Sequence, residues 1–305
     1  MQLALSSAVM ELSDYLADIP LWIKLSTATV ATCGSLGALV AFRRHCRRRT
    51  LMKKDWKQDV VYLYQFPPAV TLPTISPFAL KLETWLRMTG IRYENSSRAT
   101  WSQQGQIPFV ELNGQQLCDS SVIVEKLGNY FGIDPDSSLE PEQRAASRAF
   151  ATMIERNTVW SYFYIRYIEH INYLLSENVL GFRRSCFLQI FPLATLLRLS
   201  VRRKLEIIGL GRHQRADILS IGVDDLKAIS AYLGNKPFMN GDSPTTIDCC
   251  LFGLLCQILY IDIDAPHRDI IHSECVNLKE HTQRMKERFW PDWDVLRSTR
   301  KVVFV

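Results

Sequence analysis

The sequence contains no Cys-x-x-Cys pair, no His-Glu-x-x-His motif, no internal repeat and no low-complexity tract. Its eight cysteines are scattered and its six histidines are isolated, so no zinc knuckle or zinc-hydrolase helix is indicated. Scattered thiols of this kind are typical of a reducing compartment. Hydrophobic residues make up 47% and charged residues 22% of the 305 residues, which excludes disordered and fibrous proteins. A chain of this length has room for about two domains.

The body of the chain also lacks net charge. The formal net charge is +5, but residues 43–57 alone hold eight Lys or Arg and one Asp. Residues 58–305 are neutral overall, since residues 1–42 carry a small negative charge. A nucleic-acid-binding body usually has a basic face of its own, so we do not expect nucleic acid as a partner.

Residues 19–42 are predicted to form a transmembrane helix, because the run from Leu25 to Phe42 contains no charge. Residues 21–42 would span about 33 Å as a helix, enough for a hydrocarbon core. A cleaved signal peptide needs a basic start, which residues 1–18 do not have. A buried soluble helix is the other alternative, but it would rarely lack a polar face over so many turns.

The basic residues after this segment set the expected orientation. They predict a single-pass membrane protein with its C-terminal body in the cytosol, and contact with membrane lipid through residues 19–57. The organelle stays open, with the mitochondrial outer membrane as the alternative. Residues 1–18 would form a short extracytoplasmic tail and residues 43–58 a basic juxtamembrane linker.

The body divides into two predicted domains. Residues 59–132 show alternating β-type segments and two amphipathic helices in the order expected of a thioredoxin-like domain. The predicted strands are 59–66, 91–97, 106–112 and 115–118, and the predicted helices are 76–90 and 120–130. A polar linker at 133–143 precedes a helical domain at 144–293, and residues 294–305 form a tail.

Two stretches of the helical domain leave alternatives open. Residues 186–201 are apolar but contain Pro192 and Arg198, and are too short for a confident membrane span. They are predicted to form a buried helix, with an interfacial helix on a membrane as the alternative. Cys249, Cys250 and Cys256 are expected to pack in the core and not to bind metal, although thiolates suit soft cations.

Four short motifs appear in order. Ser76-Pro77-Phe78 opens the first helix, Ile107-Pro108 precedes the third strand, Asp119-Ser120 opens the next helix, and Thr245-x-x-Asp248 is a capping-box-like helix start. Together they resemble the glutathione transferase fold, an α/β thioredoxin-like domain followed by an all-α domain, here preceded by one transmembrane helix.

Longer segments are similar to one family. SPFALKLETWLRMTGIRYEN, GQIPFVELNG, GLGRHQRADILSIGVDDLKAISAYLGNKPFMNGDSPTTID and RFWPDW look like the failed axon connections family, which is similar to cadmium-responsive and metaxin-related proteins. The resemblance covers roughly residues 58–293. It implies a glutathione-transferase-like fold behind an N-terminal membrane segment, without a secure activity.

The glutathione transferase pattern implies a binding site for glutathione. A cis Pro108 would turn the backbone of Ile107 toward the tripeptide, Asp119 would hold its ammonium group and Ser120 its γ-glutamyl carboxylate. Ser76 would donate to the thiolate. The alternatives are a strand-start proline, plain helix caps at Ser76 and Asp119, and Tyr64 as the hydroxyl donor.

Two functions from different classes follow from the resemblance. One is an interaction module in axon development or stress response, with a homodimer or a protein as partner. The other is an active glutathione transferase that conjugates electrophiles in detoxification or metal stress. Glutaredoxin-type exchange is not expected, because no cysteine lies between Cys46 and Cys118.

Overall fold

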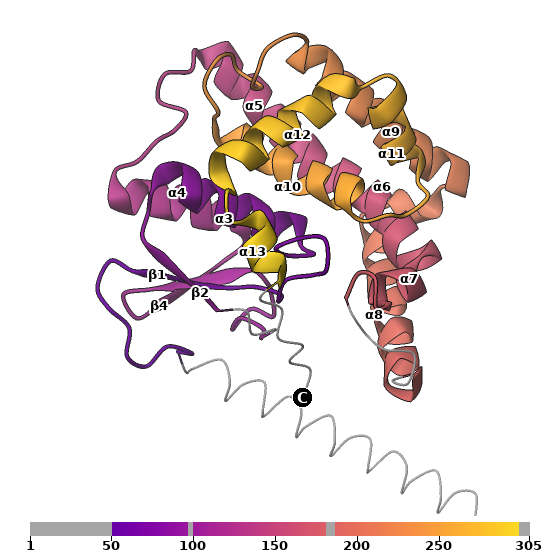
Figure 1. The fold of residues 1–305 in the computed structure, drawn as a ribbon, viewed down its shortest axis with the longest axis horizontal. Helices are drawn as coiled ribbons and strands as arrows, with labels where there is room; N and C mark the ends of the chain where they lie inside the picture. The colour runs from indigo at the N-terminus through magenta and orange to yellow at the C-terminus, as the bar shows by residue number, and fades with distance from the viewer. Residues whose placement is uncertain (1–50, 97–99, 181–186, 299–305) are drawn as a thin grey trace, which may run out of the picture. The chain divides into compact units, whose positions relative to one another are not determined.

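A computed structural model describes residues 51–96, 100–180 and 187–298 of the chain (Figure 1). The first domain is built on a four-stranded sheet in the order β2-β1-β3-β4. β1 is parallel to β2 and antiparallel to β3, and β3 is antiparallel to β4. The strands are β1 Val61–Tyr64, β2 Tyr93–Ser96, β3 Phe109–Leu112 and β4 Gln115–Cys118. This mixed sheet confirms the predicted thioredoxin-like order.

The two faces of β1 are covered by different parts of the chain. Val61 and Leu63 pack into the core beneath α3 (Pro77–Thr89) and α4 (Ser120–Phe131), which lie together over one face (Figure 1). On the opposite face, the Lys57 amide donates to the Tyr62 hydroxyl at 2.8 Å and Lys53 Nζ lies 5.1 Å from the Tyr62 ring centroid. The chain segment just before β1 therefore packs onto the sheet.

The second domain is helical, as predicted, but its first long stretch is not one regular helix. Two π-helical segments, η1 and η2, interrupt it. The elements are α5 Pro141–Met153, η1 Ile154–Thr158, α6 Val159–Phe163, η2 Tyr164–Glu169, α7 Ile171–Leu175, α8 Phe187–Ile207, η4 Leu210–Arg212, α9 Arg215–Leu233, α10 Thr246–Tyr260, α11 Pro266–Ser273, α12 Val276–Phe289 and α13 Trp293–Ser298.

α10 is the central helix of this domain. The predicted capping box is present at its start, where Asp248 Oδ2 accepts from the Thr245 backbone N–H at 2.7 Å. Cys249, Cys250 and Cys256 are buried along the helix, as expected of core thiols. Gly253 lies against the first turn of α3, because an added Cβ there would lie closer than 3.0 Å to the Pro77 carbonyl. The two domains therefore meet where α10 crosses α3.

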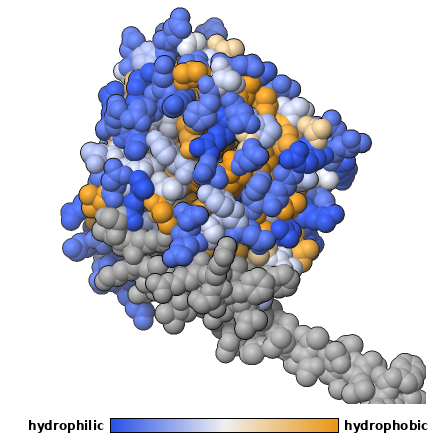
Figure 2. All heavy atoms as spheres, turned by 45° about the vertical axis from the view of Figure 1, so that its right-hand side comes forward, coloured by the Kyte–Doolittle hydropathy of each residue, from blue (hydrophilic) through white to orange (hydrophobic). Residues whose placement is uncertain are grey.

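α8 corrects the prediction of a buried helix. Ala194 and Leu205 face the core, whereas Leu193, Leu196 and Leu199 are exposed on the outward side. Figure 2 shows that apolar side chains on one face of the molecule are interspersed among hydrophilic ones. The apolar stretch in the sequence is thus a helix with only one buried side.

Within the described parts of the chain, no helix is both long enough and apolar enough to cross a membrane. This finding corrects the predicted localisation as a single-pass membrane protein. The predicted transmembrane segment, residues 19–42, lies outside the described residues. Neither that helix nor a lipid partner for residues 19–57 is supported.

Candidate functional site

The sheet register brings most of the predicted glutathione residues to one end of the sheet. Tyr64, the last residue of β1, pairs with Phe109, the first residue of β3, which in turn pairs with Cys118, the last residue of β4. Ile107-Pro108 directly precedes Phe109, and Asp119-Ser120 directly follows Cys118. The loop that leaves β1 at this end leads to Ser76 at the start of α3.

The peptide bond between Ile107 and Pro108 is cis, which confirms the prediction. Pro108 is buried, whereas Ile107 is only half-buried. The Ile107 N–H and C=O form no backbone hydrogen bond with the described residues. One residue before the sheet begins, the chain therefore offers a free donor and a free acceptor to an extended peptide.

Asp119 caps α4 from an unusual backbone conformation, with φ 70° and ψ 118°. Such a positive φ is costly for a residue other than glycine and is often found at functional sites. Its Oδ1 accepts from the N–H groups of Ser121 at 3.0 Å and Val122 at 3.4 Å. The cap that was the alternative to a ligand role for Asp119 is present, and it leaves Oδ2 without a partner among the described residues.

Ser120 occupies the first turn of α4 and is only 6% exposed. Its hydroxyl has no hydrogen-bond partner in the described parts of the chain. An unpaired hydroxyl at a helix start, next to its own backbone N–H, is suited to an anionic ligand. This group and the cap at Asp119 lie side by side in the sequence and on the same turn.

Ser76 is the N-cap of α3, and its Oγ accepts from the Ala79 N–H at 3.3 Å. The residue is 8% exposed. Accepting this bond satisfies a helix N–H and leaves the hydroxyl proton free to donate. The geometry therefore contains the cap that the sequence offered as an alternative, and it keeps the donor that a thiolate needs.

Tyr64 lies in the sheet in a different environment. Its hydroxyl donates to Glu111 Oε2 at 3.1 Å, and its ring stacks on Phe109 with the centroids 4.6 Å apart. A buried phenol that already donates to a carboxylate has no proton left for a second acceptor. The geometry disfavours the alternative in which Tyr64 supplies the hydroxyl.

Two residues of the helical domain hold the loop before Ser76, and the sequence analysis missed both. Arg166 is fully buried and donates to the Ile75 carbonyl at 2.8 Å and to Gln257 Oε1 at 2.9 Å. Gln257 Nε2 donates to the Thr74 carbonyl at 3.2 Å. These bonds fix the backbone that positions Ser76. A lone arginine among the aromatic residues of η2 was the available signal.

Comparison with known proteins agrees with this architecture. Residues 77–172 match the glutathione S-transferase N-terminal domain, and residues 222–285 match the glutathione S-transferase C-terminal domain. Failed axon connections from Drosophila melanogaster is 39% identical over 254 residues, which are 79% of this chain and 61% of that protein. The chain is similar to failed axon connections over most of its own length. It spans 61% of the length of that relative.

Other members of the glutathione-transferase-like group are more distant. An isoprene-epoxide–glutathione S-transferase from Rhodococcus is 29% identical over 65% of this chain and 87% of its own length. A metaxin-1 homolog from Caenorhabditis briggsae is 26% identical over 75% of this chain and 74% of its own length. The crystal structure of a beta-etherase from Sphingobium has the same fold, with a TM-score of 0.53 and 16% identity over 79% of this chain and 99% of its own.

Proposed function

We propose that this chain, which is similar to failed axon connections, binds glutathione at the end of the sheet where β3 begins and β4 ends. The observation that carries the proposal is Ser120 at the start of α4, a residue only 6% exposed whose hydroxyl has no partner among the described residues. An isoprene-epoxide–glutathione S-transferase among its relatives supports the same ligand.

Each group of glutathione has a counterpart in this geometry. The unpaired backbone of Ile107 would bind the extended peptide, as a strand added to a sheet edge does. Ser120 would bind the γ-glutamyl carboxylate through its hydroxyl and its backbone N–H, because Asp119 already accepts from the N–H groups of Ser121 and Val122. Asp119 Oδ2, which the cap leaves open, would bind the ammonium group.

We further propose that the protein acts mainly as an interaction module, in axon development or stress response. Ser76 already serves as a cap, and α8 adds an exposed apolar side to the helical domain. The second candidate is an active glutathione transferase. It is favoured by the Ser76 hydroxyl, whose proton stays free to donate to a thiolate. Ser76 also lies at a helix N-terminus, where the pKa of the glutathione thiol would be lowered.

Calorimetric titration of the full chain with reduced glutathione tests the binding. Ser120→Ala is expected to weaken binding about tenfold, the effect of losing one hydrogen bond to a charged group. Ser220→Ala, on the exposed side of α9, is the matched control and is expected to bind as the wild type does. Absence of binding at millimolar glutathione would reject the proposal.

Ser76→Ala separates the interaction module from the enzyme. If Ser76 stabilises a thiolate, the substitution raises the pKa of bound glutathione and slows conjugation about 10- to 1000-fold, with little change in affinity. If Ser76 is a cap alone, it costs about 1 kcal/mol of stability and leaves no catalytic signature. A wild-type chain that binds glutathione without conjugating a broad electrophile supports the interaction module.

A further inference from the structure

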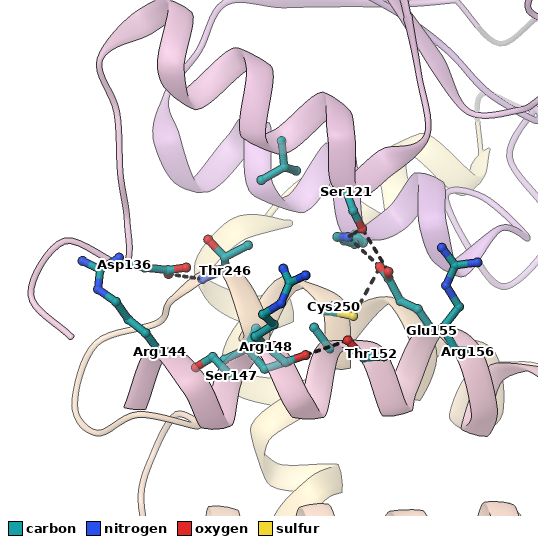
Figure 3. A pocket seen from close by; sticks show the side chains of 14 residues that line it. Ser121, Asp136, Arg144, Ser147, Arg148, Thr152, Glu155, Arg156, Thr246 and Cys250 are labelled. Atoms are coloured by element: carbon teal, nitrogen blue, oxygen red, sulfur yellow. Dashed lines mark hydrogen bonds and ion pairs between the residues drawn. The ribbon is translucent and has the colours of Figure 1, made fainter. Parts of the chain in front are cut away.

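A pocket with a volume of about 450 Å³ lies between α4, the α5–η1 segment and the first turn of α10. Figure 3 shows its side chains, with Arg144, Arg148 and Arg156 rising from the α5–η1 side. None of the five residues predicted to bind glutathione lines it. Ser121, the residue after Ser120, does line it, so the pocket adjoins the proposed glutathione residues without including them.

The two carboxylates in the lining already have partners. Glu155 accepts from Lys81 Nζ at 2.6 Å and from Cys250 Sγ at 3.7 Å on Oε1, and from Ser121 Oγ at 2.9 Å on Oε2 (Figure 3). Asp136 accepts from the Thr246 N–H at 2.8 Å, and burial raises the pKa of its carboxyl group. These acids are occupied by neighbouring donors and do not neutralise the remaining cations of the pocket.

Two of those cations have no such partner. The guanidinium group of Arg144 already has two partners, because it donates to the Leu139 carbonyl at 3.3 Å and to Asp134 Oδ2 at 3.4 Å. Arg148 and Arg156 form no side-chain hydrogen bond or ion pair with any described residue. In Figure 3 the guanidinium group of Arg148 points from α5 toward the middle of the pocket. A guanidinium fork of this kind pairs with phosphate or carboxylate oxygens through two parallel bonds.

The charge of the lining selects between those two anions. Lys81, Arg144, Arg148 and Arg156 stand against Asp136 and Glu155, which leaves a net formal charge of +2. One phosphate monoester group carries about −1.5 to −2 at pH 7, so a single group balances this charge, whereas one carboxylate does not. The pocket is also large enough for an organic molecule and not only for an inorganic ion.

Apolar walls give the organic part of such a ligand a place. Val124 of α4, Ala151 of α5 and Ile247 of α10 line the pocket from three helices. These three residues form a small apolar part of a lining that is otherwise mainly polar and charged. We propose that this pocket binds a small organic phosphate monoester, with its phosphate on Arg148 and Arg156 and its organic part against these walls.

Adenosine monophosphate is a suitable probe, because adenosine is the same molecule without the phosphate. Calorimetric titration of the full chain is expected to show binding of adenosine monophosphate at least about tenfold tighter than of adenosine. Arg148→Gln and Arg156→Gln are each expected to weaken that binding about 10- to 100-fold. Arg212→Gln, an exposed arginine of η4, is the matched control and should leave the affinity unchanged.

The results divide cleanly. Equal affinity for adenosine and its monophosphate, no binding at millimolar concentration, or wild-type affinity in both arginine variants would each overturn the proposal. Reduced glutathione is titrated in parallel. Its affinity should not change in Arg148→Gln, and saturating glutathione should not displace the probe. Competition between the two ligands would place both in one site and overturn the separate pocket, whereas loss of glutathione binding alone concerns only the proposed function.

Discussion

His267 of α11 shows how one buried residue can make folding sensitive to pH. The ring is fully buried, and its Nε2 lies 3.0 Å from Ser161 Oγ. The Ser161 hydroxyl donates its own proton to the Ile218 carbonyl at 2.5 Å, so a neutral ring with a proton on Nε2 completes the contact. Gly222 leaves room for this pair, because a Cβ there would lie closer than 3.0 Å to both side chains.

Burial lowers the pKa of His267 from its ordinary 6.5 to about 4. Between these values the unfolded chain binds a proton that the folded chain does not, so stability is intact above pH 6.5 and falls as the pH drops toward 4. The loss is expected to reach roughly 3 kcal/mol. Urea unfolding of wild type and His267→Gln at several pH values measures it. The pH slope should be smaller in the variant, and equal slopes would contradict the assignment.

At the scale of single residues, the local signals could be read from the sequence and the distant contacts could not. Ser76 and Asp119 act on N–H groups two or three residues away, so their caps follow from local pattern. Arg166 holds the loop before Ser76 from 91 residues along the chain. Only the packing of two domains decides which carbonyl a buried arginine meets.

At the scale of elements, the crossing of α3 and α10 depends on one missing side chain. A Cβ on Gly253 would lie closer than 3.0 Å to the Pro77 carbonyl, and backbone cannot rotate away as a long side chain can. Gly253→Ala is expected to destabilise the protein by about 1–3 kcal/mol through overpacking. It should also disturb the first turn of α3 and hence glutathione binding. Thermal unfolding measures the loss, with Ser220→Ala as control, and an unchanged midpoint would refute the close approach.

The sequence does not predict the π-helical form of η1 and η2 or which side of α8 is buried. η1 and η2 have the same apolar periodicity as a regular helix, and a one-residue π insertion leaves no composition signal. α8 is apolar on both sides, yet Ala194 is buried and Leu196 is exposed. Composition predicted its helical state, but which side would be covered depends on neighbours that are distant in sequence.

At the scale of the whole molecule, the C-terminal RFWPDW segment joins the two domains. Trp290 is buried and its Nε1 donates to Thr84 Oγ1 of α3 at 3.0 Å. Asp292 pairs with Arg87 of α3 through two bonds, at 2.6 and 3.0 Å, and the Arg87 guanidinium lies 3.9 Å from the Trp290 ring centroid. The RFWPDW segment therefore fixes the C-terminal end of the helical domain to α3, the helix that Ser76 caps.

Because of these contacts between the RFWPDW segment and α3, we expect the two domains to unfold together. One hydrophobic core contains Leu63 of the sheet, Leu254 of α10 and Trp290, so neither domain keeps its core without the other. Urea unfolding of the full chain followed by tryptophan fluorescence and by far-ultraviolet circular dichroism should give coincident curves.

Asp292→Ala removes the carboxylate from a half-buried arginine and is expected to cost about 1–3 kcal/mol, shifting both curves equally. Asp294→Ala, at an exposed ion pair, should shift them by less than about 0.5 kcal/mol. Two separated transitions in the wild type would show that the sheet and the helices are stable independently.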